Sequence, residues 1–388
     1  MKKSSYLFIF GRTPQLSTVE LLQFFPAATP VCDRVALVSE TDTAPERLME
    51  VLGGTVKIAR VRGSIPVLEA SEFLQFFPAT KSLTFGISTY DLVNPSIQLL
   101  SPLKKLLERV GVRARYVVPH DTEQDLSSVV VSKNKLFELV VVPQKSGFLV
   151  GETVAVQPFE AWSRRDYGRP FADSGMGMLP PKVARMAVNT ATGKGERMLL
   201  DPFCGMGTIL GEAILTGWHA LGSDASADVI EKTRANLEWL ITHDPLVPHG
   251  VATKSIMPYR LFSSDATHVS GQVAAGSLDA IVTEPYMGTT RWGGRDRGPF
   301  PERKKIRNVL RGLEKLYIGC LRDWYRILKV GGKIVIALPK YTIDRQEFFV
   351  KKVIDSCENL GYTVLAGPIE YSREQAVVRR EFFVLQKN

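Results

Sequence analysis

The sequence has few cysteines and no long apolar run. The four cysteines in 388 residues are Cys32, Cys204, Cys320 and Cys357, and none of them forms a CxxC pair. This scatter indicates neither a disulfide framework nor a zinc site, so we expect reduced thiols and no bound metal. No eighteen-residue apolar segment occurs, and the apolar stretch near the start is too short for a signal peptide. We therefore expect a cytoplasmic protein without a membrane partner.

Basic residues outnumber acidic ones by 49 to 40, a formal charge of +9 that favours a polyanionic partner. They cluster in SRRDYGR at 163–169 and in RWGGRDRGPFPERKKIR at 291–307, where arginines alternate with Trp292 and Phe300. Such a mixture suits phosphate contacts combined with stacking on unpaired bases. A charge run considered alone is more typical of a solvated loop.

The pattern of apolar residues changes along the chain. From residue 197 onward, short apolar strands alternate with helical segments, which predicts an α/β domain with a mostly parallel sheet. The last two strand-like runs, GYTVLAGPIEY and RREFFVLQK, have no helix between them, which predicts an antiparallel last strand. Residues 1–165 are less regular and predict a separate α+β module, so the expected domains are 1–165 and 166–388. We interpret 158–181 as the linker.

Three acidic residues stand at or next to the expected ends of successive strands. The first strand runs into LLDPFCGMGT at 199–208, where Gly205 and Gly207 permit a tight turn and close approach of a ligand. The second strand ends at Asp224 and the third at Asp265, where a ribose and an adenine could be bound. A single aspartate there is typical of a helix cap or turn. The succession at three strand ends favours a ligand site.

This set resembles the class I S-adenosylmethionine-dependent methyltransferases, whose amino-modifying members carry a DPFCGSGT signature close to DPFCGMGT. The resemblance implies a Rossmann-like sheet that binds S-adenosyl-L-methionine. Gly205 and Gly207 would line its methionine portion, Asp224 its ribose and Asp265 its adenine. The predicted cofactor-binding set is completed by Asp201, Phe203, Thr208 and Ala266.

The fourth strand ends in TEPYMG, residues 283–288, where RNA-directed amino-methyltransferases often carry TDPPYG. The register that keeps a carboxylate makes Glu284, Pro285 and Tyr286 the catalytic motif; matching on Pro-Tyr instead puts Thr283 at the acidic position. A carboxylate that accepts the N–H protons of an exocyclic amine would orient its lone pair toward the methyl donor. Tyr286 would stack on an extruded base. The alternative is that Glu284 caps a turn and Tyr286 lies in the core.

Other stretches resemble one lineage, the THUMP-associated tRNA guanine-N2 methyltransferases that modify guanosine 10. They are SRRDYGRPFADSGMGMLPPKVARMAVNTA at 163–191, the opening YLFIFGRTPQLSTVELL and the closing RREFFVLQK. The resemblance implies a tRNA partner and an N-terminal THUMP-like RNA-binding module, whose core would be residues 125–143. It leaves open the oligomeric state and the need for a small activator subunit. The predicted RNA-binding residues are Lys133, Lys135, Arg164, Arg165, Arg169, Arg291, Arg295 and Arg297.

Three functions are compatible with these patterns. The first is an enzyme, a tRNA guanine-N2 methyltransferase. The second is a DNA adenine-N6 or cytosine-N4 methyltransferase, which would usually carry a target-recognition domain that we do not find here. The third is a noncatalytic RNA-binding protein that retains the fold, favoured by the missing second proline of TEPYMG. For Asp166 and Arg169, an ion pair within the domain is an alternative to contact with cofactor or RNA.

Overall fold

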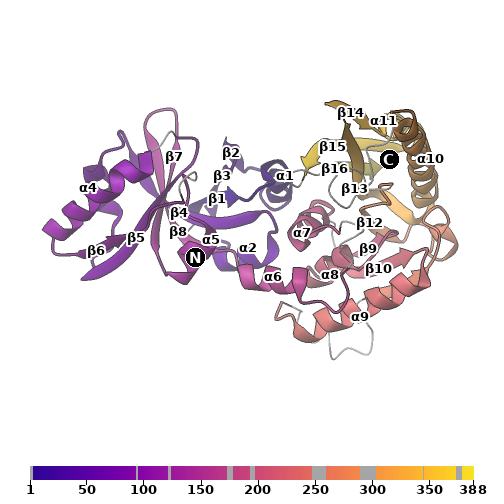
Figure 1. Ribbon diagram of the computed structural model, residues 1–388, viewed down its shortest axis with the longest axis horizontal. Coiled ribbons are helices and arrows are strands. Elements are labelled where there is room, and N and C mark those ends of the chain that lie inside the picture. Colours follow the sequence, from indigo (N-terminus) through magenta and orange to yellow (C-terminus); the bar gives the residue numbers. More distant parts are fainter. Residues whose placement is uncertain are drawn as a thin grey trace. The chain divides into compact units, whose positions relative to one another are not determined.

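The chain forms two compact units in the computed structural model, Met1–Glu160 and Ala161–Asn388, each built on an eight-stranded sheet (Figure 1). The structure describes residues 3–92, 95–120, 124–172, 178–192, 197–246, 259–288, 303–343, 345–372 and 378–388. The segment interpreted as a linker contains helix α6 (Phe159–Tyr167), and the division between the units falls within this helix. None of the helices in these ranges is long and apolar enough to cross a membrane.

The first unit has the expected α+β character. Its sheet has the order β2-β3-β1-β4-β8-β7-β5-β6, in which β5 runs parallel to β6 and β7 while the other neighbours are antiparallel. The strands are β1 (Ser4–Phe10), β2 (Thr29–Cys32), β3 (Val35–Thr41), β4 (Thr55–Ile65), β5 (Ser82–Thr89), β6 (Arg113–Tyr116), β7 (Phe137–Pro143) and β8 (Phe148–Val156). The helices are α1 (Pro14–Phe24), α2 (Pro45–Val51), α3 (Ala70–Phe73), α4 (Pro95–Arg109) and α5 (Ser128–Lys133).

A fully buried ion pair joins the strands at the centre of this unit. Lys57 of β4 donates to Glu138 of β7 at 2.6 Å, and neither side chain is exposed to solvent. The hydroxyls of Ser88 and Thr153 also donate to this carboxylate, so each of its oxygens accepts a hydrogen bond. The pair therefore ties β4, β5, β7 and β8 together, and we assign it a structural role.

The second unit has the predicted mostly parallel sheet. Its strand order is β11-β10-β9-β12-β13-β16-β15, with β14 paired to β13. Along this path β13–β16 and β16–β15 are antiparallel, and the other neighbouring pairs are parallel. The strands are β9 (Met198–Asp201), β10 (His219–Asp224), β11 (Tyr259–Ser263), β12 (Leu278–Thr283), β13 (Leu328–Ile343), β14 (Gln346–Phe349), β15 (Tyr362–Tyr371) and β16 (Val378–Lys387). The predicted antiparallel last strand is confirmed.

The chain reverses its direction of travel across this sheet at β9. Strand β9 leads through α8 (Thr208–Leu215) to β10 on one side, and β12 leads through α10 (Arg303–Ile327) to β13 on the other. Because such crossovers are right-handed, the helices on the two sides cover opposite faces. The ends of β9 and β12 therefore lie at the switch point, the place at which sheets of this kind form a ligand-binding crevice. The other helices are α7 (Pro181–Thr190), α9 (Ala227–His243) and α11 (Lys351–Asp355).

Candidate active site

The predicted cofactor loop connects β9 to α8 at the crevice. Gly205 and Gly207 have φ values of 49° and 82°, in the left-handed region that favours glycine. A Cβ on Gly205 would meet nothing nearer than 3.9 Å, whereas one on Gly207 would lie 2.9 Å from Thr233 Cγ2. Gly205 therefore leaves room for a ligand, while Gly207 allows α9 to pack closely. Phe203 is partly buried beside the Trp324 ring.

Two side chains of α9, which the sequence analysis did not single out, hold this loop from behind. Thr233 donates its hydroxyl to the carbonyl oxygen of Gly205. Asn236 donates to the carbonyl oxygens of Met206 at 2.9 Å and Phe171 at 3.0 Å. Both residues are buried, so these bonds hold the carbonyl oxygens of the loop from inside the domain. Their spacing of three places them on one helix face, a signal that the sequence did contain.

Asp224 and Asp265 lie at the same edge, at the ends of adjacent parallel strands. Asp224 is partly exposed and accepts the Ser226 N–H at 3.0 Å. Asp265 is exposed and follows β11, and the backbone N–H and hydroxyl of Thr267 hold the pKa of its carboxyl below the usual value. Ala266 is buried, and its carbonyl accepts the Trp324 Nε1–H. Asp224 and Asp265 therefore each stabilise a turn, and their carboxylates remain accessible to solvent or to a ligand.

Asp201 and Thr283 form a buried hydrogen bond across the crevice. The Thr283 hydroxyl donates to Asp201 Oδ1 at 2.7 Å, and each residue is only 1% exposed. The Phe203 N–H donates to the same oxygen at 3.1 Å. Thr283 is therefore committed to Asp201 and faces the interior, which favours the register with Glu284 at the acidic position.

Glu284 immediately follows β12, and its carboxylate is paired with the guanidinium of Arg380 on β16. The Glu284 side chain is 17% exposed and the Arg380 side chain 11%. The sequence analysis did not single out Arg380. Pro285 is buried and Tyr286 is 60% exposed, so Tyr286 is not part of the core.

Tyrosine hydroxyls hold the rest of this motif. Tyr317 of α10 donates to the carbonyl oxygen of Tyr286 at 2.6 Å, and Tyr341 of β13 donates to that of Met287. Gly288 has a φ of 79°, and a Cβ there would lie 2.7 Å from the Tyr341 hydroxyl oxygen. The segment after Pro285 is thus fixed by side chains at the place where related motifs carry a second proline.

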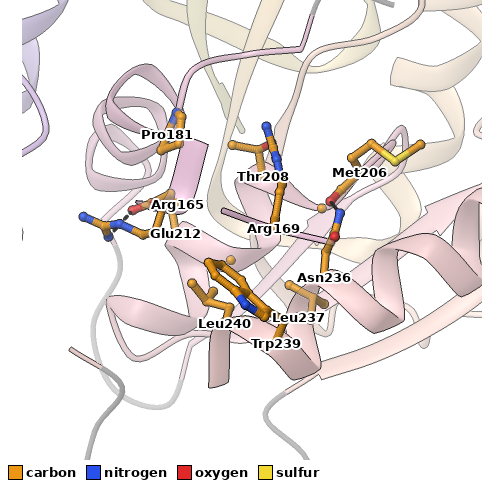
Figure 2. Close-up of a pocket in the computed structure, with 12 residues that line it drawn as sticks. Arg165, Arg169, Pro181, Met206, Thr208, Glu212, Asn236, Leu237, Trp239 and Leu240 are labelled. Carbon is orange, nitrogen blue, oxygen red and sulfur yellow. Dashed lines mark hydrogen bonds and ion pairs between the residues drawn. The ribbon is translucent and has the colours of Figure 1, made fainter. Parts of the chain in front are cut away.

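The predicted RNA-binding arginines of the 163–169 cluster occupy different environments. Arg165 and Arg169 line a pocket together with residues of α8 and α9 (Figure 2). Their side chains are 2% and 5% exposed to solvent. Arg165 pairs with Glu212 at 3.2 Å, and Arg169 donates to Thr208 at 2.7 Å. These contacts do not support the predicted RNA role of the two buried arginines, because their guanidinium groups bind inside the domain.

The charged cluster around this pocket joins four helices. Glu212 of α8 also pairs with Arg185 of α7 at 2.7 Å, and Arg165 of α6 lies 3.6 Å from Asp244 at the end of α9. Arg169 lies 3.8 Å from Asp166, a distance compatible with the alternative ion pair. Burial lowers the pKa of Arg165 and of Arg169. The cluster holds Arg165 of α6 against α7, α8 and α9. Asp224, Asp265 and Glu284 are not among the residues that line the pocket.

The other predicted RNA-binding residues divide into two groups. Arg164 is exposed, as are Lys133 and Lys135 at the end of α5 and in the following turn. The ammonium of Lys133 lies 5.6 Å from the centre of the Phe159 ring. These three side chains remain accessible to a polyanion. Arg291, Arg295 and Arg297 lie outside the described residues.

Because the pKa of the Asp201 carboxyl is raised in the folded protein, we expect the free energy of unfolding to depend on pH. Burial raises its pKa from 3.8 to about 7, with smaller increases from the charges of Asp224 and Glu284, while the bonds from Thr283 and Phe203 oppose the shift. Between these values the folded state retains a proton that the unfolded state releases, so stability falls as pH rises from 4 to 7. Asp201→Asn retains the acceptor oxygen without this titration.

We expect the free energy of unfolding of the wild type to fall relative to Asp201→Asn by up to about 1.4 kcal/mol per pH unit from pH 4 to 7. Above pH 7 the difference should stay constant. Urea unfolding followed at half-unit intervals of pH measures it. Parallel curves for the two proteins would show that Asp201 does not titrate in this range.

Comparison with known proteins supports the resemblance. Residues 168–246 match the UPF0020 family, described as an RMKL-like methyltransferase domain. The tRNA (guanine(10)-N2)-dimethyltransferase of Pyrococcus abyssi is 28% identical over 223 residues, 58% of this chain and 52% of that protein. The protein of the same name from Methanothermobacter thermautotrophicus is 30% identical over 195 residues, 50% of this chain and 48% of that protein. The chain thus spans about half the length of these curated relatives.

Two solved structures resemble nearly the whole chain. TrmN from Thermus thermophilus has a TM-score of 0.54 and 16% identity, with 99% of this chain and 100% of that chain covered. A possible methylase from Clostridium difficile 630 has a TM-score of 0.52 and 12% identity, with 100% and 99% covered. At these identities the similarity shows a shared fold alone. The predicted resemblance is confirmed: the chain is similar to tRNA (guanine(10)-N2)-dimethyltransferases, and residues 168–246 of its second unit are similar to an RMKL-like methyltransferase domain.

Proposed function

We propose that the protein transfers a methyl group from S-adenosyl-L-methionine to the N2 amine of a tRNA guanosine, in the manner of guanosine-10 methyltransferases. The observation that carries the proposal is the position of Glu284, a carboxylate one residue beyond β12 at the edge where the cofactor loop also begins. The names of the similar proteins support tRNA as the substrate and guanine as the base. This reaction favours a cytoplasmic location.

The residues at the crevice fit S-adenosyl-L-methionine. The open space beside Gly205 suits the methionine portion, and the partly exposed carboxylate of Asp224 suits the hydroxyls of a ribose. Asp265, at the end of the neighbouring strand, would accept a hydrogen bond from the amino group of the adenine. Bound there, the cofactor supplies an electrophilic methyl group on a sulfonium.

Glu284 would act on the substrate amine. The lone pair of the guanine N2 is delocalised into the ring, so the amine is a poor nucleophile until its N–H groups are bound and oriented. A carboxylate oxygen that accepts one of these N–H groups both orients the amine and can receive its proton. The exposed ring of Tyr286 offers a face on which an extruded base can stack.

We propose that the first unit, Met1–Glu160, is a THUMP-like module that binds tRNA, with the second unit as the catalytic domain. The exposed Lys133 and Lys135 of the predicted core support contact with phosphates, as does the net charge of +9. Arg164 is the exposed member of the 163–169 cluster. A noncatalytic relative would have no need of both the cofactor loop and a carboxylate held at the crevice.

The substrate is tested by incubating the full-length protein with labelled S-adenosyl-L-methionine and either an unmodified tRNA transcript or duplex DNA. We expect methyl transfer to the tRNA and the appearance of N2-methylguanosine in the nucleoside digest, identified by mass spectrometry. Methyl groups in DNA but not in tRNA would favour the DNA alternative. A protein that binds tRNA and cofactor without transfer would favour the noncatalytic one.

Glu284→Gln should lower kcat by about 100- to 10,000-fold, because the neutral amide cannot receive a proton and accepts the amine less strongly. The affinity for S-adenosyl-L-homocysteine, measured by calorimetry, should stay within about threefold of the wild type, a difference below 1 kcal/mol. Thr283→Ser is the matched control, since it keeps the hydroxyl that binds Asp201. Wild-type turnover by Glu284→Gln would remove this carboxylate from the mechanism.

Asn236→Ala should weaken binding of S-adenosyl-L-homocysteine by about tenfold, because it leaves the buried Met206 carbonyl without its donor and loosens the loop. The control is Lys232→Ala on the same helix, whose partner Asp228 is exposed. Calorimetric titration compares the three proteins. Equal affinities for Asn236→Ala and wild type would show that the loop keeps its shape without this side chain.

A further inference from the structure

Arg380 stands at the edge of the sheet where the catalytic motif lies. Because β16 is antiparallel to the other main strands, it begins at the edge where the parallel strands end. Its register places Arg380 opposite Pro339 of β13 and Tyr371 of β15. Strand β13 lies between β16 and β12, so the Arg380 side chain reaches across β13 to Glu284.

The contact between these two side chains is more than a surface ion pair. Arg380 Nε donates to Glu284 Oε1, and both side chains are more than four-fifths buried. The Arg380 guanidinium also lies 5.8 Å from the centre of the Tyr371 ring. A charge-assisted bond in such surroundings is stronger and better oriented than one in water. Glu284 Oε1 is therefore held at a fixed place by a residue 96 positions further along the chain.

We propose that Arg380 is a positioning residue for Glu284, an inference that rests on the function proposed above. By binding Oε1, the guanidinium fixes the orientation of the carboxylate that would accept the amine of the substrate base. Glutamate has one more rotatable bond than the aspartate usual at this place, so its carboxylate needs an additional restraint to keep one orientation. Arg380 supplies that restraint, and its positive charge favours the ionised carboxylate that the reaction requires.

If the ion pair were purely structural, the loss of Arg380 would have different effects on activity. If Arg380 only fastened the start of β16, its loss would lower stability and scale activity equally at every pH. If it positions and ionises Glu284, its loss lowers kcat more than it changes KM and moves the acidic limb of the pH–rate profile to higher pH. The two roles are thus separable by measurement.

The variants for the test are Arg380→Gln, Arg380→Lys and Arg379→Gln. Glutamine can still donate a hydrogen bond but lacks the charge, and lysine restores the charge. Arg379 is the matched control, because it neighbours Arg380 on β16, is 36% exposed and pairs with Glu370 at 3.0 Å. Each full-length protein is assayed for methyl transfer to the unmodified tRNA transcript between pH 5.5 and 9, beside the wild type and Glu284→Gln.

We expect Arg380→Gln to lower kcat by about 100-fold with KM values within about threefold, and to shift the acidic limb upward by about one pH unit. Arg380→Lys should recover kcat to within about tenfold of wild type, because lysine restores the positive charge but lacks the planar guanidinium group. Arg379→Gln should match the wild type. Combining Arg380→Gln with Glu284→Gln should add little to the loss from Glu284→Gln, because the two residues act as a unit.

A second readout does not depend on turnover. Glu side chains labelled with ¹³C at Cδ are titrated by NMR, and the Glu284 signal is assigned by its loss in Glu284→Gln. We expect its midpoint to lie about one pH unit higher in Arg380→Gln than in the wild type. A Glu284 midpoint that is unchanged in Arg380→Gln overturns the positioning role. So does a pH–rate profile in which Arg380→Gln lowers the rate by the same factor at every pH. Wild-type kcat in Arg380→Gln while Glu284→Gln is inactive overturns this inference alone, whereas a wild type that methylates no RNA overturns the proposed function with it.

Discussion

The hydrogen bond from the Thr283 hydroxyl to the Asp201 carboxylate is the contact on which the candidate site depends. The backbone pairing of strand β9 with strand β12 ends at Leu200 and Ile281. The side-chain bond continues the connection past that point, at the switch point where a ligand crevice forms in such sheets. The two loops begin immediately after the bonded residues, so the bond sets the starting positions of the proposed cofactor loop and of the proposed catalytic motif together.

Each loop is then held from outside by donors that bind its carbonyl oxygens. A loop at a strand end has backbone groups that no ladder satisfies, and these must find partners or water. Here the partners are side chains of packed helices and strands, so the loop geometry follows from the packing of the domain rather than from the loop sequence. The anchors are Thr233 and Asn236 for the cofactor loop, and Tyr317 and Tyr341 for the motif after Glu284.

The sequence predicted what depends on local pattern: the alternation of strands and helices, the antiparallel ending and the acids at successive strand ends. It did not predict the partner of Glu284, because that contact joins residues far apart in the chain and follows from the antiparallel direction of β16. It also placed Arg165 and Arg169 on an RNA surface. Their burial depends on Glu212, Asp244 and Thr208, which lie on helices whose packing no local pattern reveals.

The departures of TEPYMG from TDPPYG are connected through the same tertiary contacts. A second proline would restrict the backbone by itself, and an aspartate would need little restraint beyond the backbone. With Tyr286 and Glu284 at these places, both restrictions are lost from the local sequence. The structure contains a contact that can replace each restriction. The hydroxyls of Tyr317 and Tyr341 hold the backbone, and Arg380 holds the longer side chain of Glu284. The missing proline is therefore weak evidence for a decayed site, because rigidity supplied by the local sequence in related motifs is supplied here by α10, β13 and β16.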